Sequence, residues 1–219
     1  MKRWSGDPMD ERMIWISEIG VTVVIVILAL ALRRYVSKKR ITVKQITFVG
    51  IMSAMGTALA VVSFVPLGPN INVDFSHIGT FIVAIALGPF YGMIAGGLIA
   101  IYPMTVFGNP LFPPGKALTG LMVGLLANRL RLAVNSPERK LPLIVPAVVV
   151  GWIPEAVFIL VTLAIVGIPY MLPLTVVEGI LVKGTVEVIL LGILCQFLFS
   201  NRVLRHKLES LRESTSSTT

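Results

Sequence analysis

The chain contains little charge and a single cysteine. Charged residues make up 14% of its 219 residues, against about 25% in ordinary soluble domains. Hydrophobic residues make up 55%, and the mean hydropathy is +0.88. A water-soluble fold of this length cannot bury so much apolar surface. The composition therefore predicts an all-α membrane protein with several transmembrane helices and no sizeable soluble domain, because helices satisfy their own backbone hydrogen bonds in lipid.

Several chemistries have no motif in the sequence. The lone cysteine, Cys195, lies in an apolar run and excludes both an intramolecular disulfide framework and a cysteine-based metal cluster. The phosphate-binding, zinc-protease and nucleophile-elbow patterns of glycine, histidine and serine are absent. His77 has no histidine neighbour in the apolar core, since His206 lies near the C-terminus. We expect no enzyme, no cofactor and no metal, and any energy for transport must come from elsewhere.

The apolar segments predict one N-terminal helix followed by a core of six. The first segment, 14–32, is longer than a signal-peptide core and ends at Arg33, so it reads as a retained anchor helix. The expected organisation is an anchor helix and basic loop at 1–40, a six-helix membrane domain at 41–201 and a cytoplasmic tail at 202–219, whose last polar residues are expected to be disordered. The six core segments are 44–66, 73–88, 90–107, 115–132, 142–167 and 172–200.

The placement of the cations predicts the topology. Fourteen of the 19 Lys and Arg residues fall in three clusters, at 33–44, 129–140 and 202–212. The positive-inside rule places these clusters in the cytoplasm, which puts the N-terminus outside and the C-terminus inside. The net charge of +8 therefore reflects topology and not nucleic-acid binding. The outer loops carry only Asp74 and Lys116 as charges.

One outer loop gathers polar and aromatic residues that suit a small-molecule site. Ligand sites combine apolar walls with a few convergent polar groups. Asp74 and Ser76 also have the chemistry of helix N-caps, so a structural role for the loop is equally simple and is compatible with binding. The candidate ligand residues here are Asn70, Asn72, Asp74, Phe75 and His77, together with Lys116 from the next outer loop.

Four further ionisable residues lie inside the later apolar segments: Glu155, Glu178, Lys183 and Glu187. Such groups cost about 2.5–3.5 kcal/mol to insert, so they mark either buried pairs or function. Lys183 and Glu187 share a helix face, and Lys183 and Glu155 lie at similar depth, which makes an interhelical ion pair plausible. The group therefore either fixes helix register or contacts a polar ligand. A carboxylate at this depth also fits a proton-coupled secondary transporter, whereas a membrane enzyme or assembly factor would need motifs that are absent.

Small residues repeat every four positions in the first core segment, at Gly50, Ala54 and Ala58. Such a stripe allows close helix approach in lipid. Its partner is either another helix of this chain or a second protein, and the spacing does not distinguish them.

These features together resemble the substrate-binding S components of energy-coupling-factor (ECF) vitamin transporters. The resemblance covers about 44–200 and rests on the six-helix core, Ala54-x-x-x-Ala58, Asp74-Phe75-Ser76-x-Ile78 and Gly88-Pro89-x-x-Gly92. The runs 73–76 and 182–184 look most similar to the riboflavin-specific members. The chain departs from those members at 97–100, where a Lys-Asn pair is expected, and at 116–120, where an Asn is expected.

The resemblance implies uptake of a vitamin or related small molecule from outside the cell, with riboflavin as the leading candidate. The implied partners are a transmembrane coupling subunit and two ATPase subunits, at the plasma membrane. Ala54 and Ala58 would dock on the coupling subunit, and Lys183 would lie near the substrate. Glu155 and Glu178 would instead favour a cationic or amine-bearing ligand.

Overall fold

The computed structural model describes residues 41–63, 66–68, 71–72, 74–132, 138–167 and 169–213, together with Val26 and Leu30. The predicted anchor helix at 14–32, apart from those two residues, lies outside the described part of the chain. So do Asn70 and the tail after 213, and the expectations for them stay predictions.

Helices dominate the described residues and occupy all six predicted core segments. They are α2 (Val43–Val62), α3 (His77–Leu87), α4 (Pro89–Ile99), α5 (Ile101–Phe107), α6 (Phe112–Leu130), the 3₁₀ helix η1 (Glu138–Leu143), α7 (Ile144–Ile159), the π-helical η2 (Leu160–Val166), α8 (Leu174–Ser200) and α9 (Arg202–Glu213).

The sequence missed a short hairpin, which is the one departure from an all-α fold among the described residues. Strands β1 (Pro66–Gly68) and β2 (Ile71–Asn72) pair antiparallel, with Pro66 opposite Asn72. The predicted helix from 73 was wrong at its start, because α3 begins only at His77. Pro66 and Gly68 lie in β1, and proline and glycine favour turns over a continued helix.

Four helical stretches among the described residues are long and apolar enough to cross a bilayer, judged by length and composition. They are Val43–Val62, Pro89–Phe107, Leu141–Val166 and Leu174–Ser200. The helix α3 is apolar but has only 11 residues. The chain is therefore a multi-pass membrane protein, while the count of six spans plus one remains a prediction.

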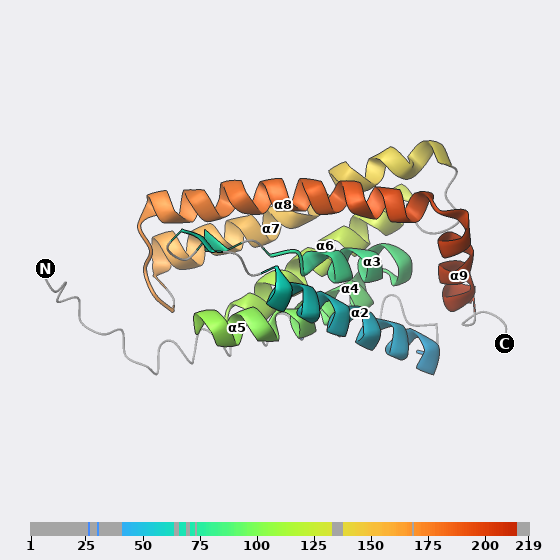
Figure 1. Ribbon diagram of the computed structural model, residues 1–219, viewed down its shortest axis with the longest axis horizontal. Helices are drawn as coiled ribbons and strands as arrows, with labels where there is room; N and C mark the ends of the chain where they lie inside the picture. Colours follow the sequence, from blue (N-terminus) through green and yellow to red (C-terminus); the bar gives the residue numbers. More distant parts are fainter. Residues whose placement is uncertain are drawn as a thin grey trace, which may run out of the picture.

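The two ends of the molecule differ in structure (Figure 1). The long α8 runs beside α7, and α9 turns across one end, where Leu208 is buried. The side chain of Gln45, at the start of α2, donates to the backbone oxygen of Leu211 at 3.3 Å and accepts from the Tyr91 hydroxyl at 2.7 Å. The hairpin and α5 lie at the opposite end (Figure 1). These contacts close the α9 end of the bundle.

Glycines bring α4 and α6 into close contact. A methyl group added to Gly120 would lie 2.0 Å from the backbone oxygen of Gly92, and one added to Gly96 would lie 2.3 Å from the backbone oxygen of Lys116. The turn before α4 depends on Gly88, whose φ of +99° disfavours other residues. From the sequence, small residues were interpreted as a packing stripe only on the first core helix, and Gly92 only as part of a family motif, so this crossing was missed. The close crossing of α4 and α6 fixes the position of the segment of α6 that carries Lys116.

We expect Gly120→Ala to lower the free energy of unfolding by about 1–3 kcal/mol, because neighbouring backbone must move to admit the methyl group. Gly50→Ala is the matched control, since a methyl group there meets nothing within 4 Å and alanine favours helix. Thermal unfolding in detergent measures both. Equal melting temperatures for the two variants would contradict this account of the crossing.

Candidate functional site

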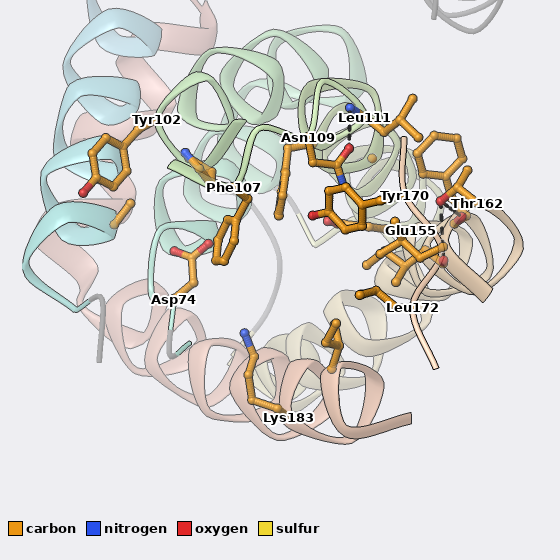
Figure 2. A pocket seen from close by; sticks show the side chains of 18 residues that line it. Asp74, Tyr102, Phe107, Asn109, Leu111, Glu155, Thr162, Tyr170, Leu172 and Lys183 are labelled. Atoms are coloured by element: carbon orange, nitrogen blue, oxygen red, sulfur yellow. Dashed lines mark hydrogen bonds between the residues drawn. The ribbon is translucent and has the colours of Figure 1, made fainter. Parts of the chain in front are cut away.

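A cavity lies among α5, α6, α7 and α8, toward the end of the molecule that carries the hairpin (Figures 1 and 2). Its empty space, counted together with the open solvent at its mouth, is about 880 Å³. Its lining includes the aromatic residues Tyr102, Phe107, Phe112, Phe158 and Tyr170, and the ionisable residues Asp74, Glu155 and Lys183. The cavity thus has apolar walls and a few charged groups.

The loop before α3 is held by a buried ion pair. The Lys116 ammonium group on α6 lies 2.6 Å from Asp74 Oδ2 and also donates to the Ser76 hydroxyl. Asp74 Oδ1 accepts the backbone N–H of Ser76 at 2.9 Å. Lys116 is only 2% exposed, and a buried ammonium group requires such partners. The pair therefore holds Asp74 at the cavity wall.

A second ion pair reaches the same loop from α8. Lys183 Nζ lies 2.9 Å from Glu187 Oε2, one helical turn away. The other carboxylate oxygen of Glu187 accepts the backbone N–H of Asp74 at 2.8 Å. Figure 2 shows the Lys183 side chain pointing from α8 into the cavity. These contacts therefore connect α6, the loop before α3 and α8 beside the cavity.

Glu155 lies on α7, directly after Pro154, and its carboxylate is buried at the cavity wall. It accepts a hydrogen bond from the Thr119 hydroxyl on α6. His77 Nε2 lies 3.8 Å from Glu155 Oε1, beyond hydrogen-bond distance, and the His77 ring stacks on Phe81. The carboxylate is thus held in place by a neutral hydroxyl.

The loop after η2 closes one side of the cavity. Tyr170 and Leu172 line it, and the side chain of Tyr170 forms a hydrogen bond with Asn109. Burial raises the pKa of the Tyr170 phenol, while this hydrogen bond acts in the opposite direction. Tyr170 therefore remains a neutral hydroxyl at physiological pH, available as a donor or acceptor.

The structure brings together most of the predicted ligand residues. Asp74, Glu155 and Lys183 line the cavity, and Lys116 and His77 contact members of this group. Lys183 pairs with Glu187 on its own helix, because a partner one turn away needs no second helix. The predicted interhelical pair of Lys183 with Glu155 stays a prediction.

Two predicted residues do not join the group. Glu178 is exposed on the first turns of α8, and Phe75 is 37% exposed; neither lines the cavity. Asn72 is described only as part of β2. The predicted Ser76 cap was wrong, since the Ser76 side chain makes no capping hydrogen bond to α3. Its hydroxyl instead accepts a hydrogen bond from the Lys116 ammonium group.

Sequence reasoning missed Thr119 and the aromatic walls. Thr119 follows Lys116 by three residues, a spacing that puts both on one helix face, so this signal was available. The aromatic residues offered no such signal, because aromatic residues in apolar segments are normally interpreted as part of a packed core. Glu187 was recognised as ionisable, but its contact with the Asp74 loop spans 113 residues of sequence.

The stripe on α2 lies on an open face. Gly50, Ala54 and Ala58 are exposed, whereas Gly56 and Ala60 are buried against the bundle. Among the described residues, no helix of this chain covers Ala54 and Ala58. Whether the stripe packs against another part of this chain or against a second protein stays a prediction.

Comparison with known proteins defines the class. The family model for the ECF transporter, substrate-specific component, matches residues 44–200, and the chain belongs to this family. Members work with a membrane-embedded coupling subunit and ATPases and bind small vitamins. This confirms the resemblance at the family level. It also confirms that the chain is not an enzyme, since the family is a transporter component.

Two known proteins are similar to parts of this chain at lower coverage. The chain is 30% identical to a UPF0397 protein of Streptococcus gordonii over 95 residues, which cover 42% of this chain and 51% of that protein. It is 25% identical to the biotin transporter BioY of Rhodobacter capsulatus over 164 residues, 74% of each chain. The chain thus spans about half the length of the first of these relatives. No solved structure matches, and riboflavin specificity finds no support in these comparisons.

We expect Lys116→Met to lower the free energy of unfolding by about 3–5 kcal/mol, because it leaves the Asp74 carboxylate without its cation. Lys44→Met, at an exposed position, is the matched control and should change stability little. Adding Asp74→Asn to Lys116→Met should recover part of the loss. Thermal unfolding in detergent tests this, and equal stabilities for the two single variants would show that the buried pair contributes nothing.

Proposed function

We propose that this chain captures a vitamin or related small molecule in the cavity and delivers it to an ECF-type importer. The observation that carries the proposal is a cavity with aromatic walls and three ionisable groups, Asp74, Glu155 and Lys183, at one end of a membrane bundle. Membership of the substrate-specific family supports this role.

The same proposal has the cavity facing the exterior. The cations at the end of α6, in η1 and in α9 lie toward the end opposite the hairpin (Figure 1), and the positive-inside rule assigns such clusters to the cytoplasm. A ligand would then enter from outside and leave toward the cell interior after assembly with the coupling subunit and two ATPases.

The vitamin itself is a separate question. The riboflavin interpretation rested on two short runs of sequence, whereas one relative is named as a biotin transporter. We therefore propose the class of ligand, a small molecule with apolar and polar parts, and treat riboflavin and biotin as candidates.

We expect the purified protein to retain a vitamin-sized compound, identified by mass spectrometry of the extracted small molecules. Lys183→Ala should retain at least tenfold less of it, equivalent to about 1.4 kcal/mol, because Lys183 points into the cavity. Val186→Ala changes an exposed residue of the same helix and should retain as much as the wild type. Equal retention by both variants would remove Lys183 from the site.

We also propose that the open face of α2 docks on the coupling subunit. Ala54→Trp and Ala58→Trp should disrupt co-purification with that subunit, because a large side chain prevents close helix approach, while ligand retention stays intact. Val150→Trp, on an exposed position of α7, is the control. Undisturbed assembly of both alanine variants would place the docking surface elsewhere.

The energy source distinguishes this proposal from a proton-coupled secondary transporter, which the buried Glu155 would otherwise suit. In proteoliposomes, uptake of the retained compound should require the coupling subunit, the ATPases and ATP. Uptake by this chain alone, driven by a proton gradient, would favour the secondary transporter.

A further inference from the structure

One acidic side chain at the cavity has no close lysine or arginine partner among the ion pairs of the described residues. Asp74 pairs with Lys116 at 2.6 Å, and Glu187 pairs with Lys183 at 2.9 Å. These two ion pairs leave the carboxylate of Glu155, which is only 5% exposed. Its one recorded ion-pair contact among the described residues is with His77, at 3.8 Å.

His77 does not supply the missing positive charge. A protonated imidazole carries an N–H on both ring nitrogens and needs an acceptor for each when buried. The Nδ1 atom of His77 is buried and has no hydrogen-bond partner among the described residues. This environment suits the neutral form.

Within 41–213, the described residues place no further cation at the cavity. The residues between 41 and 213 that the structure does not describe have no charged side chains. The remaining cations of this range lie at the start of α2, at the end of α6 and in η1 and α9, toward the other end of the molecule (Figure 1). Among the described residues, no lysine or arginine is thus recorded at ion-pair distance from the Glu155 carboxylate.

The walls of the cavity suit a cation as well. A buried carboxylate without a counter-charge is costly, and aromatic faces attract positively charged nitrogen. Tyr102, Phe107, Phe112, Phe158 and Tyr170 supply such faces around the same cavity. We infer that the natural ligand carries a positively charged nitrogen next to an aromatic or apolar body, and that Glu155 binds this nitrogen. The inference rests on the proposed function and specifies the substrate class of that site.

Equilibrium binding of three probes to the purified full chain tests the inference. Thiamine is a cationic aromatic vitamin, riboflavin is uncharged and biotin is an anion at neutral pH. We expect thiamine to bind most tightly. Glu155→Gln preserves the size and the acceptor for Thr119 but removes the charge, and it should weaken thiamine binding at least tenfold.

Two variants control the measurement. Glu178→Gln makes the same change at an exposed position of α8 and should leave thiamine affinity within twofold of the wild type. Glu155→Asp keeps the charge and should bind thiamine more tightly than Glu155→Gln, which separates the charge from a general effect on folding. Unchanged melting temperatures would confirm that all three variants are folded.

Three results would overturn the inference: no thiamine binding by the wild type, tighter binding of biotin or riboflavin, or an unchanged thiamine affinity in Glu155→Gln. If biotin or riboflavin binds more tightly than thiamine and Lys183→Ala weakens that binding, the proposed function still holds. Only the inference of a cationic ligand then fails. Retention of no small molecule at all by the purified wild type would count against the proposed function itself.

Discussion

The buried pair of Lys116 and Asp74 is the constraint on which the cavity depends. Lys116 is only 2% exposed, and a buried ammonium group requires hydrogen-bonding and ionic partners. The loop before α3, which supplies these partners, therefore lies against α6. The same loop donates its backbone N–H to Glu187, which ties it to α8. Gly96 allows α4 to approach α6 beside the Lys116 backbone. Close glycine packing and a buried ion pair therefore fix one cavity wall together.

One side of α2 is buried against the bundle and the other side is exposed. Its buried side uses Gly56 and Ala60 to pack closely on the bundle, where Gly56 lies against Ile99 and the backbone of Ser76. Its exposed side carries Ala54 and Ala58. The Ser63 hydroxyl at its end accepts the backbone N–H of Phe75 at 3.2 Å. The helix that offers the proposed docking face is thus bonded directly to the loop at the ligand cavity.

The sequence predicted the helical class and the ionisable residues around the cavity, but not which of them meet. Composition and apolar segment length suffice for helices in lipid, and the scarcity of charge made Asp74, Lys116, Glu155 and Lys183 conspicuous. Which of them meet depends on how distant segments pack, and Lys116 and Asp74 are 42 residues apart. The hairpin was missed because its two strands are too short for a periodic pattern. Glu178 was misplaced because position within an apolar segment does not show which face is exposed.

The central claim is that the polar end of this bundle is a binding site for a small molecule. An experimental density map of the protein purified with its ligand tests it most directly. The account predicts density for one small molecule within the cavity, in contact with Glu155, Lys183 and the aromatic walls. A map with ligand density elsewhere in the molecule and side chains filling this cavity would contradict it.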